Sequence, residues 1–79
     1  MKVKTAQPLT IDEMIKLTGK DALYQIGPKE MRRSRIMNAT YGQEIDVDVT
    51  VYDRITGIKW GLRRVNKPDY GYLAFRIQF

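Results

Sequence analysis

The chain has 79 residues, enough for one domain with one hydrophobic core. It contains no cysteine and no histidine. Their absence excludes disulfides, thiolate metal sites and thiol catalysis, and it removes the commonest metal ligand. Fourteen basic residues against nine acidic ones leave a net charge of +5, which favours polyanionic partners such as nucleic acid.

We expect residues 1–9 to form a flexible basic lead-in and residues 10–79 to form a single domain. Lys2 and Lys4 are not followed by an apolar run, so a signal peptide is not expected. No stretch approaches the roughly 20 apolar residues that a membrane span requires. Together with the lack of disulfides, this predicts a cytoplasmic protein without membrane contact.

The first predicted helix covers residues 11–18. Thr10 precedes it and Glu13 follows three residues later, which is the spacing of a capping box. One face of this helix is expected to pack on the rest of the domain, and it consists of Ile11, Met14, Ile15 and Thr18, which recur at helical spacing.

Two further short helices are expected over residues 20–27 and 28–40, separated where Gly27 ends one and Pro28 begins the next. The apolar residues of the third helix form no clean stripe. Residues 35–41 could therefore equally be a strand that turns back into the next one.

The start of the stretch 10–36 resembles a helix-turn-helix that reads DNA. Gly27 and Pro28 fall where the second helix of that motif should continue, which disfavours the arrangement. A winged variant, with residues 45–65 as the wing, stays an alternative.

From residue 44 onward, apolar and polar residues alternate, which is typical of half-buried strands. Three antiparallel strands are expected, over residues 44–52, 58–63 and 72–79. A four-residue loop at 54–57 would pair Val51 with Trp60, and the same parity would pair Trp60 with Ile77.

The predicted fold class is α+β. Two or three short N-terminal helices, over residues 10–40, would pack on one face of an antiparallel β-meander over residues 44–79. The meander would have three strands, or four if an additional segment joins it.

The other face of the meander is expected to be solvated and to bind nucleic acid. Its candidate residues are Tyr52, Lys59, Arg63, Tyr72 and Arg76. The tyrosines would stack on bases and the basic side chains would meet phosphates, which favours single-stranded over duplex nucleic acid.

Gly61 lies in the middle of the central predicted strand, where a missing side chain would let a base or a backbone approach closely. The alternative is that this face binds no ligand, is exposed to solvent and carries ion pairs between neighbouring strands, such as Asp48 with Arg63. Asp46 and Asp48 would also repel phosphate along one edge.

A second candidate binding segment is rich in arginine and consists of Lys29, Arg32, Arg33 and Arg35. The planar fork of arginine suits phosphate and carboxylate alike. The partner of this segment would therefore be a nucleic-acid backbone or an acidic protein surface.

Nothing in the sequence indicates catalysis. Glu44, Asp46 and Asp48 would lie on one strand face about 6.6 Å apart, too far to share a metal ion without another element. Ser34 is the sole serine, and no histidine is present to activate it. We expect no enzyme, no cofactor and no metal.

The C-terminal strand is expected to be an exposed edge. Arg76, Ile77 and Phe79 are therefore candidates for self-association into a homodimer. The alternative is that residues 1–5 form an extra strand that pairs with this edge within one chain.

These patterns predict a small basic nucleic-acid-binding protein without catalytic activity. The alternative is a protein-binding regulator or inhibitor, of the kind that small phage or plasmid genomes encode. It would act on a host protein through the arginine-rich segment or the C-terminal edge strand.

Overall fold

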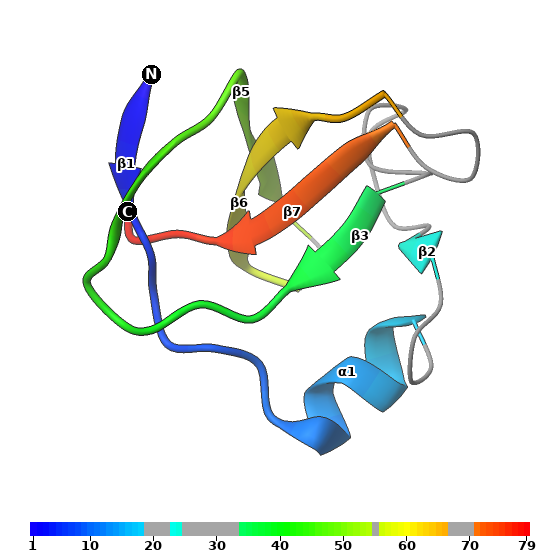
Figure 1. Ribbon diagram of the computed structural model, residues 1–79. Coiled ribbons are helices and arrows are strands. Elements are labelled where there is room, and N and C mark those ends of the chain that lie inside the picture. Colours follow the sequence, from blue (N-terminus) through cyan, green and yellow to red (C-terminus); the bar gives the residue numbers. More distant parts are fainter. Residues whose placement is uncertain (19–22, 25–33, 55, 67–70) are drawn as a thin grey trace.

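The computed structural model describes residues 1–18, 23–24, 34–54, 56–66 and 71–79. Within these ranges the chain forms one short helix and seven strands, and Figure 1 shows how they are arranged. They are β1 (Lys2–Lys4), α1 (Ile11–Thr18), β2 (Leu23–Tyr24), β3 (Ser34–Met37), β4 (Glu44–Asp46), β5 (Val49–Asp53), β6 (Ile58–Arg64) and β7 (Tyr72–Arg76). The described part is mostly β, so the predicted α+β fold with two or three helices on a three-stranded meander is wrong.

Five strands form the main sheet in the order β2-β3-β7-β6-β5, and β1 and β4 form a second, two-stranded sheet. β7 is antiparallel to β6 but parallel to β3, which precedes it by more than thirty residues. A parallel pair needs a long crossover connection. Here β4, β5 and β6 lie within that crossover, so the meander prediction missed an essential part of the topology.

The prediction of the helix over residues 11–18 is confirmed by α1, and so is its capping box. Thr10 N donates to Glu13 Oε1 at 3.0 Å, and Glu13 N donates to Thr10 Oγ1 at 3.1 Å. The expected apolar face is wrong in part, because Ile11 and Ile15 are exposed, whereas Met14 packs against the core. No helix in the described ranges is long and apolar enough to cross a membrane.

The region predicted as a second and third helix contains two strands among its described residues, β2 and β3. In β3, Ser34 and Ile36 are buried while Arg35 between them is exposed. This period of two explains why no helical stripe exists, and it favours the strand alternative. It also removes the second helix that a helix-turn-helix would require at these residues.

The β5–β6 hairpin has the predicted register. Val51 pairs with Trp60, and the turn between the strands is closed by a hydrogen bond of 2.8 Å from Gly57 N to Asp53 O. Gly57 has a φ of 74°, which glycine adopts without the strain that a β-carbon would cause.

The predicted register of β6 with β7 is wrong by one residue. Leu62 faces Ala74 rather than Phe75, and Phe75 faces Gly61. Side-chain size is consistent with the difference at these two pairs, since Leu62 meets the small Ala74 and Phe75 meets Gly61, which has no side chain. The slip exchanges the two faces of β7 relative to the prediction.

Both faces of the main sheet therefore carry a buried core. One face carries a core formed by Leu9, Ile36, Ile58, Trp60, Leu62 and Ala74, with Met14 of α1 packed against it. The other carries a second core of Ile45, Val47, Phe75 and Ile77, to which β1 adds Val3. The face that was expected to be solvated is thus largely covered by the chain's own β1 and β4.

Gly61 lies beneath this cover, not at an open surface as predicted. A β-carbon built there would come within 2.9 Å of Val47 Cγ1 and 3.1 Å of Ile77 Cγ2. The close approach that glycine permits is therefore made by the second core and not by a bound base.

The N-terminal segment does not form the expected loose lead-in. It forms β1 and continues into a bridge between Thr5 and Ile77, and Gln78 N donates to Lys4 O at 2.9 Å. This agrees only in part with the alternative in which residues 1–5 pair with the C-terminal edge, because β1 itself pairs with β4 and only Thr5 forms a bridge to the C-terminal segment. Since β7 also lies between β3 and β6, the open edge on which the homodimer prediction rested is absent from the described structure.

Candidate nucleic-acid interface

The structure divides the predicted outer-face residues between the two faces of the main sheet. Tyr52, Lys59 and Arg63 lie on the face that carries the second core, whereas Tyr72 and Arg76 lie on the opposite one. The one-residue shift between β6 and β7 causes this division. The five residues therefore do not form one continuous platform.

Arg76 has a partner within the fold. Its Nη1 atom lies 3.5 Å from Glu13 Oε2, and both side chains are about one-third exposed, at 32% and 40%. This ion pair joins α1 to the main sheet. Arg76 is accordingly less accessible to a phosphate than the prediction assumed.

The arginine-rich segment is described only at its end. Arg35 lies on β3, is exposed, and shares a cross-strand row with Leu73 and Arg63. Lys29, Arg32 and Arg33 lie outside the described residues.

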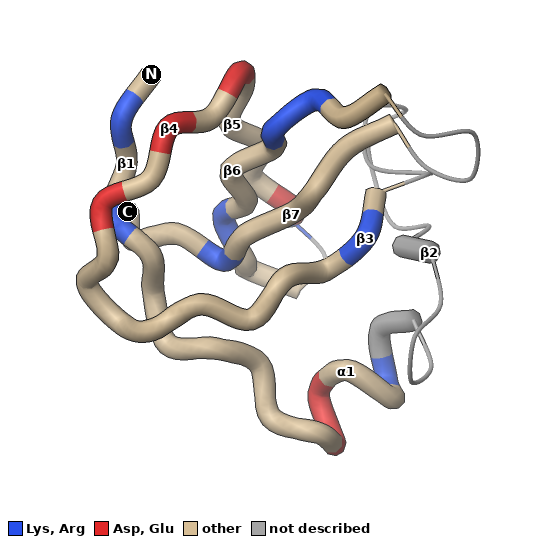
Figure 2. Tube along the Cα trace, in the orientation of Figure 1, with Lys and Arg blue, Asp and Glu red and all other residues tan. Residues whose placement is uncertain are grey.

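Two adjacent arginines at the end of β6, Arg63 and Arg64, form the most distinct basic feature of the described surface, and we call them the arginine pair. The guanidinium carbon of Arg63 lies 5.5 Å from the centre of the Phe75 ring, and that of Arg64 lies 5.9 Å from the centre of the Tyr72 ring. Both arginines are exposed. Successive residues on a strand point to opposite faces, so the pair straddles the end of the sheet. Figure 2 shows this basic end of β6 in blue.

The chain holds each arginine by further contacts. Arg63 Nε donates to the carbonyl oxygen of Asp46 at 2.9 Å, and Arg64 Nη2 lies 3.5 Å from the Tyr72 hydroxyl. The hydrogen bond to Tyr72 raises the pKa of Arg64 above its already high ordinary value, so its charge persists at physiological pH. Neither guanidinium forms an ion pair with a carboxylate in the described part of the chain.

The nearby carboxylates are partly neutralised within the fold. The Met1 ammonium donates to Asp46 Oδ1 at 2.7 Å, and this bond lowers the pKa of the Asp46 carboxyl below its ordinary value. Asp48 Oδ2 accepts the main-chain N–H of Arg64 at 2.6 Å. Glu44 pairs with Lys2 at 3.8 Å. No group of three acidic side chains among the described residues could hold a metal ion.

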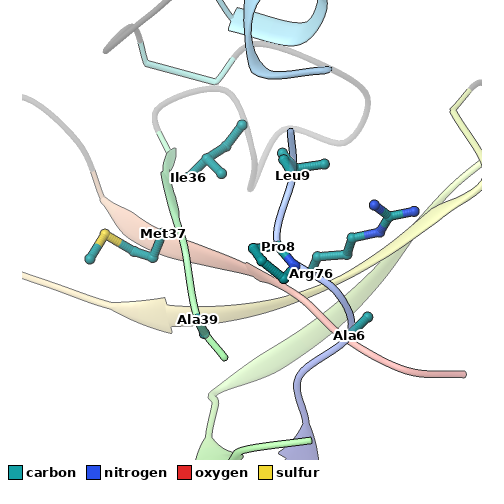
Figure 3. Close-up of a pocket in the computed structure, with 7 residues that line it drawn as sticks. All are labelled: Ala6, Pro8, Leu9, Ile36, Met37, Ala39 and Arg76. Carbon is teal, nitrogen blue, oxygen red and sulfur yellow. The ribbon is translucent and has the colours of Figure 1, made fainter. Parts of the chain in front are cut away.

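A hollow lies where β3 and the N-terminal segment meet side by side next to β7 (Figure 3). It is too narrow to hold a water molecule, and its walls are apolar side chains, those of Ala6, Pro8, Leu9, Ile36, Met37 and Ala39. Among the described residues, Arg76 is the one charged residue of this lining. This lining contains no pair of titratable groups for acid–base chemistry.

Sequence reasoning missed two residues that the structure brings to the surface sites. Arg64 was given no role, yet it lies at the end of β6, where its long side chain reaches solvent. Phe79 was assigned to a dimer edge, whereas its ring contacts Tyr52 of β5. The signal for Arg64 was its position beside Arg63 just before a loop. No sequence signal pointed to the contact between Phe79 and Tyr52.

Comparison with known proteins found no match for this chain. A scan against family models found no matching family, and searches of curated proteins and of solved structures found no similar protein. Function must therefore be argued from the chemistry of the sites themselves.

Proposed function

We propose that this protein binds nucleic acid without catalysis, using the arginine pair to contact the phosphate backbone. One observation carries the proposal: Arg63 and Arg64 are exposed, each lies over an aromatic ring, and neither has a carboxylate partner among the described residues. In a chain with a net charge of +5, a polyanion is the partner that this arrangement fits best.

The aromatic contacts make the pair suitable for phosphate. A guanidinium that rests on a ring has already lost part of its side-chain freedom, so less entropy is lost when it binds. The edge of each guanidinium can still donate two parallel hydrogen bonds to phosphate oxygens. Because the two side chains lie on opposite faces of the sheet end, they would contact different phosphates of one backbone.

Arg35 would extend the same basic surface across β7. It lies two strands away from Arg63 on the same face of the sheet, with Leu73 between them. The proposal also includes Lys29, Arg32 and Arg33, which immediately precede β3 in the sequence. The proposal also places the protein in the cytoplasm, because a chain without cysteine suits a reducing compartment.

A salt titration of binding tests the proposal. Arg63→Gln and Arg64→Gln should each reduce the slope of log affinity against log salt by about 0.7 for a single strand and about 0.9 for a duplex. Lys16→Gln, the same loss of charge on α1, should leave the slope unchanged. Equal slopes for wild type and for both arginine variants would refute the role of the arginine pair.

Asp48→Asn provides a complementary test. The amide keeps an oxygen that can accept the Arg64 N–H, but it removes a negative charge beside the pair. Binding should become tighter in low salt if phosphate approaches here.

A pull-down before and after nuclease treatment addresses the alternative function. A stoichiometric protein partner that is retained after nuclease treatment would favour a protein-binding regulator.

A further inference from the structure

Tyr52 and Phe79 form an exposed aromatic contact at the corner of the molecule opposite to the arginine pair along β6. Their ring centres are 5.5 Å apart and their planes are inclined by 62°. Tyr52 is 51% exposed and Phe79 is 85% exposed. Rings this exposed contribute little to the core, yet aromatic surface is costly to leave in water. We call these two residues the aromatic corner.

Main-chain hydrogen bonds hold the corner in place. Tyr52 pairs with Lys59 across the β5–β6 hairpin, and Ile77 N donates to Lys59 O at 2.9 Å. Gln78 is bonded in turn to Lys4 of β1. The contact between the rings therefore joins two segments whose backbones are fixed, which is the kind of support that a preorganised binding surface needs.

The charge around the aromatic corner is basic. Lys59 lies directly across from Tyr52 on the same sheet face, and the exposed Arg54 follows β5. The carboxylate of Asp53, which lies between Tyr52 and Arg54, is buried. Exposed rings with cationic neighbours suit a ligand that is both aromatic and anionic.

We propose that the aromatic corner stacks an unpaired base, so that the protein selects single-stranded nucleic acid. This inference rests on the proposed function, because the arginine pair supplies the phosphate contacts. Lys59 and Arg63 lie four residues apart on one face of β6, about 13 Å at 3.3 Å per residue. A strand of a few nucleotides can span this distance, whereas the bases of a duplex are stacked and paired and cannot reach the rings.

The experiment compares three ligands of equal length by fluorescence anisotropy: an oligothymidylate, an abasic strand with the same phosphates, and a duplex. Wild type should bind the oligothymidylate more tightly than the abasic strand, by about 5-fold to 150-fold for each stacked base. Tyr52→Ala and Phe79→Ala should abolish this preference and leave duplex binding unchanged. Tyr52→Phe, which keeps the ring, should retain the preference.

The outcomes separate this inference from the proposed function. If wild type binds both strands equally while the arginine variants still lower the salt slope, the stacking inference is overturned and phosphate binding stands. If Tyr52→Ala weakens duplex binding as much as single-strand binding, the inference is also overturned. Unchanged salt slopes in the arginine variants refute the proposed function. Thermal melting of each variant identifies a loss of folding, and Phe79→Ala then decides because its ring lies outside both cores.

Discussion

The side chain of Val47 lies over Gly61, where a β-carbon would come within 2.9 Å of its Cγ1 atom. Gly61→Ala should therefore destabilise the protein by roughly 1–3 kcal/mol, because the second core must shift to accept a methyl group. Urea denaturation would measure this. Gly71→Ala is the matched control, since its β-carbon would meet nothing within 4 Å, and it should change stability by less than about 0.5 kcal/mol. Equal stability of both variants would show that the second core is not packed on Gly61.

Thr5 joins the N-terminal strand to the loop before β4. Its hydroxyl donates to Thr40 O and accepts from Gln43 N at 2.9 Å, and the residue is fully buried. Thr5→Val removes both side-chain hydrogen bonds, and each lost bond should cost about 0.5–1.5 kcal/mol. Thr5→Ser keeps the hydroxyl and should cost about 1 kcal/mol for the lost methyl group. A valine variant as stable as the serine variant would contradict this role of the hydroxyl.

The capping box at the start of α1 should have a measurable effect on stability. Thr10→Ala removes the acceptor of the Glu13 N–H and should lower the free energy of unfolding by about 1 kcal/mol. For a domain of this size, that corresponds to a decrease in melting temperature of roughly 4–8 °C. Thr10→Ser keeps the cap and should melt close to wild type. Nucleic-acid affinity should be the same in all three proteins.

Stability should fall in acid partly because of Glu13. The hydrogen bond from the Thr10 N–H lowers the pKa of Glu13, and the charge of Arg76 adds to this. Because the pKa of Glu13 is lower in the folded state than in the unfolded state, the carboxylate stabilises the fold at pH values above the unfolded pKa of about 4.3. This contribution to stability is lost as the pH falls through the folded-state pKa. Glu13→Gln can still accept the hydrogen bond but does not titrate. Its unfolding free energy should therefore depend less steeply on pH between about pH 5 and pH 3. Parallel pH profiles would contradict the prediction.

Local sequence signals were sufficient for two elements. The capping residues Thr10 and Glu13 lie three positions apart, so the start of α1 depends on contacts within one turn. The β5–β6 hairpin followed from alternation and a four-residue loop, because loop length sets the register of adjacent strands. Both elements are short-range, and neither depends on where the rest of the chain packs.

The candidate sites could be predicted only in part. Arg63, Lys59 and Tyr52 were identified from the hairpin, and they share one face as expected. Arg76 and Tyr72 were assigned to that face through the β6–β7 register, which the longer loop between these strands does not determine. The contact of Tyr52 with Phe79 joins residues 27 positions apart and depends on how β1 and the C-terminal segment pair.

The sequence by itself determined the basic charge, the capped helix and the first hairpin, since each depends on composition or on neighbouring residues. The tertiary structure decided the parallel pairing of β3 with β7, the register of β7 and the cover of β1 and β4 over Gly61. These features depend on the fit of large side chains against small ones across distant segments, as with Leu62 opposite Ala74 and Phe75 opposite Gly61. Alternation reports that a residue is buried, but it does not report which segment buries it.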